Sequence, residues 1–181
     1  MQQSTSRIQV VPLQHPNLDA VDAALAQARH ATITGFLAYY RSIHPLDALP
    51  ARSRFNPMAI PRVLPHLVLT EVDYPQGLDA PARFRVKVAG DRVVDALGMA
   101  LHGRYLHEIA NQSEPTVRFA IESRQAVVEA GRLTYRHGRP RIRFPLDFAN
   151  IEALHCPLAE DGATIDQIVS VFHYEGTGTA G

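Results

Sequence analysis

The sequence has few of the residues from which covalent frameworks and metal centres are built. It contains one cysteine, Cys156, among 181 residues, which excludes a disulfide framework within the chain and any zinc or iron–sulfur site with several cysteine ligands. Nine histidines are present, but His102 and His107 are five positions apart and nothing matches a zinc-ligand spacing such as H-E-x-x-H. We therefore expect no metal and no cofactor.

The sequence also lacks an excess of charge and a long apolar run. Its 18 basic and 18 acidic residues cancel, so no overall field attracts nucleic acid or an anionic membrane. No apolar stretch approaches the roughly 18 residues of a membrane span, and the N-terminus has no apolar core of signal-peptide length. We expect a cytoplasmic protein of one domain, with neither nucleic acid nor membrane as a partner.

Glycine loops that cradle phosphates are missing as well. In KVAGDRVVDALGMALHGRYL, residues 87–106, the glycines Gly90, Gly98 and Gly103 are spaced far more openly than in G-x-G-x-x-G, the pattern that brings backbone amides to a pyrophosphate. These glycines indicate a strand end and turns between short helices. There is also no G-x-S-x-G, and Cys156 lies in an apolar strand pattern, so no catalytic set is evident.

The first part of the chain is organised as an arm, a helix and a connector. Residues 1–16 show no sustained period and form a flexible arm. Apolar residues at three- and four-residue spacings predict one helix over residues 17–43. Five prolines in residues 44–65 exclude a long helix and predict an extended, wrapped connector.

The predicted helix carries more aromatic surface than one core can accept, because two tyrosines are adjacent. We therefore expect part of it to cover a partner or to form a homodimer. The residues concerned are Phe36, Leu37, Tyr39 and Tyr40.

Residues 66–175 form the predicted core, and 176–181 a disordered tail. Alternation in RFRVKVAG places Phe84, Val86 and Val88 on one face, and one buried and one wet face favours an antiparallel sheet. Along the core we expect, in this order, two strands, of which RFRVKVAG is the second, then short helices, a longer helix ending at Gly131, and three strands. This order predicts an α+β fold: a five-stranded antiparallel sheet with the short helices and the longer helix on one face, plus the N-terminal helix.

This order and several motifs resemble the PAS domain family, and more closely a group of small stand-alone bacterial PAS-like proteins, over about residues 36–172. The motifs are LPARSRFNPMAIPRVLPHLVLTEV, RFRVKVAGDRVVDALGMALHGRYL, the helix to Gly131 and CPLAEDGATIDQIVSV. The family usually carries a tryptophan in the helix before the connector. This chain has no tryptophan, so Tyr39 or Tyr40 takes that place.

The resemblance implies a non-catalytic sensory or regulatory module, with a pocket for an unknown small ligand and contacts to a signalling partner. Haem-binding PAS domains take an axial histidine from the longer helix, which has none here, and flavin photochemistry needs a cysteine earlier than Cys156. The alternative is a small α+β enzyme, an isomerase or hydrolase, with Asp91, Asp95 or Tyr105 as its acid or base in the same pocket.

Arg124 follows the apolar stripe of the longer helix and needs a partner there, because an unpaired buried charge is costly. Either it reaches the surface or a core acid, or it holds an anionic ligand. The residues predicted to enclose the ligand are Phe84, Val86, Val88, Leu97, Leu101, Tyr105, Phe119, Arg124 and Val128.

A cluster of arginines in RLTYRHGRPRIR forms a second candidate site. RLTYR matches R-x-x-x-R, half of a cyclic-dinucleotide signature, but the second half is absent downstream. The cluster is therefore either an anion patch or a solvated hairpin tip that docks a partner. Its members are Arg132, Arg136, Arg139, Arg141 and Arg143.

Overall fold

The computed structural model describes residues 14–109 and 114–177. Residues 1–13 of the predicted arm and 178–181 of the predicted tail lie outside this part, whereas Pro16 begins a helix and Gly176 ends a strand. None of the described helices is long and apolar enough to cross a membrane.

The elements are α1 Pro16–Gln27, α2 Ala31–Ile43, three short 3-10 turns η1 Arg52–Arg54, η2 Pro57–Ala59 and η3 Leu64–His66, β1 Leu67–Asp73, β2 Arg83–Ala89, α3 Asp91–Leu97, α4 Leu106–Ile109, α5 Glu114–Ala130, β3 Thr134–Gly138, β4 Phe148–Leu158 and β5 Gln167–Gly176.

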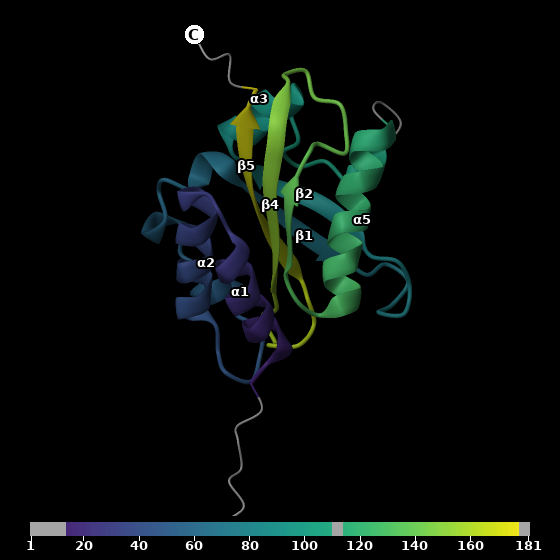
Figure 1. The fold of residues 1–181 in the computed structure, drawn as a ribbon. Coiled ribbons are helices and arrows are strands. Elements are labelled where there is room, and N and C mark those ends of the chain that lie inside the picture. The colour runs from purple at the N-terminus through teal and green to yellow at the C-terminus, as the bar shows by residue number, and fades with distance from the viewer. Residues whose placement is uncertain (1–13, 110–113, 178–181) are drawn as a thin grey trace, which may run out of the picture.

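The strands form one five-stranded sheet in the order β2-β1-β5-β4-β3, and every neighbouring pair is antiparallel. The predicted α+β fold class is confirmed. Helices α1 and α2 cover one face of the sheet, and α5 lies on the other (Figure 1).

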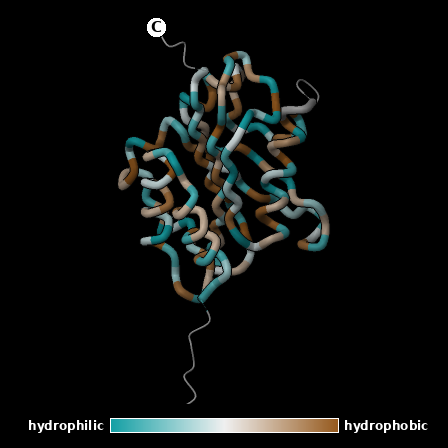
Figure 2. The backbone as a smooth tube through the Cα atoms, viewed as in Figure 1, coloured by the Kyte–Doolittle hydropathy of each residue, from teal (hydrophilic) through white to brown (hydrophobic). Residues whose placement is uncertain are grey.

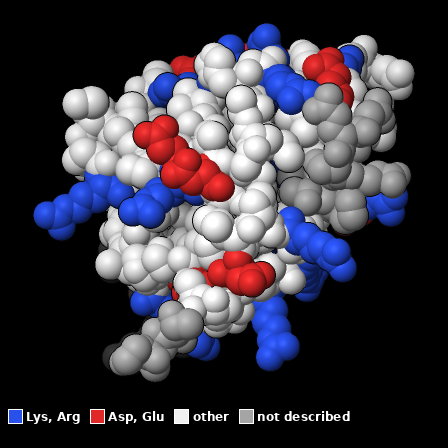
Figure 3. Space-filling view, turned by 90° about the horizontal axis from the view of Figure 1, so that it is seen from above, with Lys and Arg blue, Asp and Glu red and all other residues white. Residues whose placement is uncertain are grey.

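Alternation along the strands supplies two separate cores, one for each face. On β4, Leu154 and Cys156 pack with α1 and α2, whereas Ala153 and His155 face the α5 side. Figure 2 shows the hydrophobic segments concentrated in the strands between the two helical layers. On the face drawn in Figure 3, acidic and basic side chains are interspersed, as expected for a chain without net charge.

The N-terminal helix predicted over residues 17–43 is in fact two helices. The carboxylate of Glu152 on β4 accepts hydrogen bonds from the backbone amides of Arg29, at 2.8 Å, and His30, at 3.0 Å. These amides belong to the break, and the His30 side chain then caps α2 by accepting from the Thr32 amide. A tertiary contact therefore ends α1 and starts α2.

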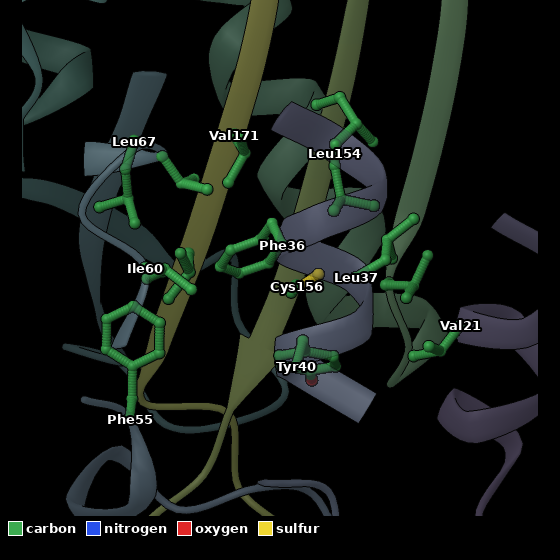
Figure 4. Packing of buried hydrophobic residues seen from close by; sticks show 14 of the residues in the cluster. Val21, Phe36, Leu37, Tyr40, Phe55, Ile60, Leu67, Leu154, Cys156 and Val171 are labelled. Atoms are coloured by element: carbon green, nitrogen blue, oxygen red, sulfur yellow. The ribbon is translucent and has the colours of Figure 1, made fainter. Parts of the chain in front are cut away.

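The assignment of α2 to a dimer face is corrected by its burial. Phe36, Leu37 and Tyr40 have no exposed surface, and Figure 4 shows them packed among the strands. The Tyr40 hydroxyl donates to the carbonyl of Pro157, at 2.6 Å. Tyr39 is partly buried, and its hydroxyl accepts from the Asn56 amide. Homodimerisation stays a prediction, but these four residues are internal contacts of one chain.

The connector packs against the chain in short turns and approaches the start of α3 closely. A Cβ atom at Gly90 would lie 2.3 Å from the Leu64 carbonyl oxygen and 2.4 Å from that of Pro65. Only glycine fits there. Gly98 ends α3 in the left-handed conformation, with φ of 66°. The backbone of Leu64-Pro65 thus packs directly against Gly90.

A β-bulge changes the predicted face of Val88. In the β1–β2 pairing, Thr70 lies opposite Val86 but Leu69 lies opposite Val88, so Lys87 is the extra residue. Phe84 and Val86 are buried on the α5 side, whereas Val88 is turned to the opposite face and is 49% exposed.

Candidate ligand-binding cavity

A cavity of about 90 Å³ lies between the sheet and the helical layer formed by α3, α4 and α5. Its walls are mainly apolar and come from four parts of the chain. The sheet contributes Val68, Val86, Ile151, Ala153, His155, Phe172 and Tyr174. Residues 93–109 contribute Val93, Leu97, Met99, Leu101, Leu106 and Ile109, α5 contributes Val117, Phe119, Ala120, Ser123 and Arg124, and the segment around β3 contributes Arg136, Arg141, Ile142 and Phe144.

Five of the nine predicted pocket residues line this cavity, namely Val86, Leu97, Leu101, Phe119 and Arg124. The other four do not. Phe84 and Val128 pack in the same hydrophobic core without reaching the cavity. The bulge turns Val88 away. Tyr105 lies against the guanidinium groups of β2, with Arg83 at 4.7 Å from its ring centre, and its hydroxyl donates to Asp73 at 2.7 Å.

Arg124 is the deeply buried cationic group of the cavity. Its side chain is 4% exposed. Nε donates to Thr70 Oγ1 at 3.0 Å, and Nη1 donates to the Ala120 carbonyl oxygen at 3.0 Å. Among the described residues, no carboxylate forms an ion pair with it. Burial lowers its pKa to about 10, so the guanidinium keeps its charge at neutral pH.

His155 is a polar cavity residue that the sequence analysis missed. It is buried on β4, and its Nδ1 lies 2.8 Å from Ser170 Oγ. Burial, assisted by the positive charge of Arg124, lowers its pKa to about 3, so the ring is neutral at physiological pH. Strand alternation could have found it, because Leu154 and Cys156 on either side face the opposite core.

The arginine cluster divides between the cavity and the surface. The guanidinium groups of Arg136 and Arg141 lie 5.7 and 5.8 Å from the ring centre of Phe119, and both line the cavity. Burial and the charge of Arg141 lower the pKa of Arg136. Arg132, Arg139 and Arg143 are exposed and do not line the cavity. Two of the five arginines predicted as an anion patch thus line the cavity.

Comparison with known proteins agrees with this architecture. A model of the PAS domain family matches residues 28–172. The chain belongs to the PAS domain family. Among solved structures it is similar to an RNA-binding light-oxygen-voltage receptor, at 13% identity and a TM-score of 0.37, over 86% of this chain and 48% of the receptor chain. The chain thus spans about half the length of that receptor. No curated protein matches it.

The residues proposed for acid–base chemistry do not meet in the cavity of this PAS domain. Asp91 and Asp95 are exposed on α3. Asp95 lines a separate hollow with His66 and His173, and Tyr105 lies outside the cavity as described. Among the described side chains, no aspartate or glutamate lines the cavity. The prediction that Asp91, Asp95 or Tyr105 lies in this pocket is therefore corrected.

The described part of this PAS domain also holds no group of three or more histidine, cysteine or acidic side chains that could bind a metal ion. Cys156, on the opposite face of the sheet, is buried, and burial raises the pKa of its thiol well above the ordinary value. A thiol of this kind packs as a small apolar group.

Proposed function

We propose that this PAS domain is a non-catalytic sensory module that binds a small molecule in the cavity beneath α5. Occupancy of the cavity is relayed to a signalling partner, or within a homodimer, through protein contacts. Membership of the PAS family supports a sensory or regulatory role. The observation that carries the ligand-binding part is the cavity itself, which encloses a charged side chain with no counter-ion in the described part of the chain.

The composition of the cavity wall supports a ligand site over a packing defect. Protein interiors are packed about as densely as organic crystals, and an empty space forfeits contacts on every side. A buried charge adds a further cost unless it is paired. A ligand that fills the space and interacts with Arg124 offsets both penalties.

The position of the cavity supplies a route for a signal. Val93 and Leu97 of α3, Leu101 in the following turn and Leu106 of α4 all contact the cavity. Gly98, which ends α3, and Gly103, which precedes α4, both have positive φ angles. A ligand that binds one arrangement of these short helices better than another shifts the population toward it. The surface formed by residues 91–109 then changes for a partner.

A cavity-filling variant tests the proposal. Ala153→Ile places extra methylenes from β4 into the cavity, whereas Ala149→Ile makes the same change at an exposed position of the same strand. We expect native mass spectrometry to find a small molecule on the wild-type protein and on Ala149→Ile, but not on Ala153→Ile. A thermal-shift screen should show the same order of ligand response.

Filling a real cavity should also raise the thermal midpoint of the unliganded protein. If all three proteins respond alike to every ligand, the cavity is not the binding site. If none carries or binds a small molecule, the ligand-sensing part of the proposal is wrong, and protein contacts alone would remain.

A further inference from the structure

We infer that the cavity binds a short aliphatic monocarboxylate, with its carboxylate on Arg124 and its hydrocarbon chain against the apolar wall. This inference rests on the proposed function, because it names the chemical class of the ligand that the cavity takes. Three properties of the cavity carry it: its charge, the geometry of its donor and its size.

The charge of the lining is one-sided. Arg124, Arg136 and Arg141 line the cavity together with neutral His155, and no acidic side chain among the described ones does. Glu122 lies in a neighbouring groove between α5 and β3 and does not line the cavity. The hydrogen-bond acceptors that Arg124 has, a hydroxyl and a backbone carbonyl, are neutral. The described part of the chain thus supplies no counter-charge, and we assign that role to an anion from outside.

The donor geometry favours a carboxylate. Nε of Arg124 donates its single N–H and Nη1 donates one of its two, which leaves one N–H of Nη1 and both of Nη2 without a partner in the described part of the chain. A guanidinium fork matches the planar carboxylate. Arg124 is the deeply buried guanidinium of the cavity and His155 stays neutral, whereas Arg136 is only partly buried and Arg141 is exposed. A monoanion balances the charge at the buried end, and the mainly apolar wall around it disfavours a phosphate dianion, which costs more to desolvate.

The size of the cavity limits the rest of the ligand. Its volume is about 90 Å³, below the roughly 150 Å³ of an apolar cavity that accommodates benzene. A short hydrocarbon chain fits this space, and the wall around it is formed by side chains such as Val86, Leu101 and Phe172. Butyrate has the required charge and marks the upper limit of size, because it has as many non-hydrogen atoms as benzene.

The entrance has the same preference. The outer groove shares Phe119, Ser123, Arg136 and Arg141 with the cavity. An anion that approaches between α5 and β3 therefore meets two arginines before it reaches Arg124. Glu122 lines the same groove, so two positive charges face one negative charge, and this positive excess raises the local concentration of anions.

Calorimetric titration of the full chain at neutral pH tests the inference. The probes are sodium butyrate, its neutral isostere butyramide, the cation butylamine, and inorganic phosphate as an anion without a hydrocarbon chain. We expect butyrate to bind best. Arg124→Met, which keeps length and removes charge, should weaken butyrate about 10- to 100-fold, as for the loss of a charge-assisted hydrogen bond. It should leave butyramide unchanged.

Arg124→Lys should recover part of the affinity, because it restores the charge without the fork. Arg132→Met, at an exposed arginine outside the cavity, is the matched control and should bind butyrate like the wild type. Circular dichroism of each variant establishes that it is folded before titration.

Equal binding of butyrate and butyramide, or no effect of Arg124→Met, overturns the anion assignment and leaves a ligand-binding cavity in place. Stronger binding of phosphate than of butyrate overturns the carboxylate assignment. If butyrate does not bind but Ala153→Ile still abolishes binding of a co-purified molecule, this inference fails while the proposed function stands. If no molecule binds at all, both fail.

Discussion

The sheet face beneath α1 and α2 is filled with large aromatic and aliphatic side chains, whereas the face beneath α5 encloses a cavity of about 90 Å³. Both faces also bury polar groups. On the α1–α2 face, Asn17 donates to the Tyr40 hydroxyl and accepts from the Leu133 amide, and Glu152 accepts from two backbone amides and the Tyr135 hydroxyl. These polar groups tie parts of one chain together.

On the α5 face the buried polar groups include a charge. Arg124 has neutral partners and no counter-ion among the described residues, and His155 contacts Ser170 through one ring nitrogen. The two faces therefore use buried polar groups differently. On one face these groups join parts of the chain, and on the other they leave a charge beside a cavity, which the proposed function assigns to a ligand.

The largest effect should come from removing the helices of the filled face. Deletion of residues 1–43 exposes the core against which Phe36, Leu37 and Tyr40 pack, and burial of each such side chain is worth roughly 2 kcal/mol or more. The total approaches the whole stability of an ordinary domain. We expect no cooperative thermal transition by circular dichroism. A truncated chain that still melts cooperatively would show that α1 and α2 are a detachable element.

A single substitution at Glu152 should have the next largest effect. Glu152→Ala leaves the Arg29 and His30 amides without their acceptor at the break between α1 and α2. We expect the free energy of unfolding to fall by about 3 kcal/mol, measured by urea titration. Glu122→Ala, an exposed glutamate on α5, should change it by no more than about 0.5 kcal/mol. Equal effects at both positions would contradict the structural role of Glu152.

Helices and strands that depend on residues close to one another in the sequence could be predicted. Strand alternation and the turn residues located all five strands, and the periodicity of α5 placed Arg124 toward the sheet. The break in the N-terminal helix could not be predicted, because its cause is a carboxylate 123 residues away in the chain. No proline or glycine stands at residues 28–30 to signal it.

Cavity residues could be predicted only where a strand or helix keeps its regular periodicity. The prediction for Val88 was wrong because a bulge in the β1–β2 pairing turns its side chain to the opposite face. Such a bulge depends on the partner strand. Arg136 and Arg141 resemble solvated hairpin residues in sequence. Their contact with Phe119 depends on how the segment before β4 folds back over α5, which is a tertiary feature.

On the cavity face, acid should destabilise the protein through His155. The unfolded ring has a pKa near 6.5, and the folded pKa is about 3. Between these values the unfolded state binds more protons, so stability is complete above about pH 6.5 and falls below it by about 1.4 kcal/mol per pH unit. At pH 5 this amounts to about 2 kcal/mol from His155 alone.

His155→Gln isolates this contribution from that of the other histidines whose pKa is lowered by burial, His44, His66 and His173. Urea titrations from pH 7 down to pH 5 should show a flatter decline for the variant than for the wild type. Parallel curves would mean that His155 can be protonated in the folded cavity.

The smallest expected effect comes from replacing a polar side chain by an apolar one on each face. The test compares whether the free energy of unfolding rises or falls. Arg124→Met removes a desolvated charge that lacks a counter-ion, so the unliganded protein should become more stable by about 1 kcal/mol. Asn17→Leu leaves the Tyr40 hydroxyl and the Leu133 amide short of partners and should lower stability by about 1 kcal/mol or more. Urea denaturation measures both. Destabilisation by both changes would mean that Arg124 serves the fold as Asn17 does, and the distinction between the two faces would fail.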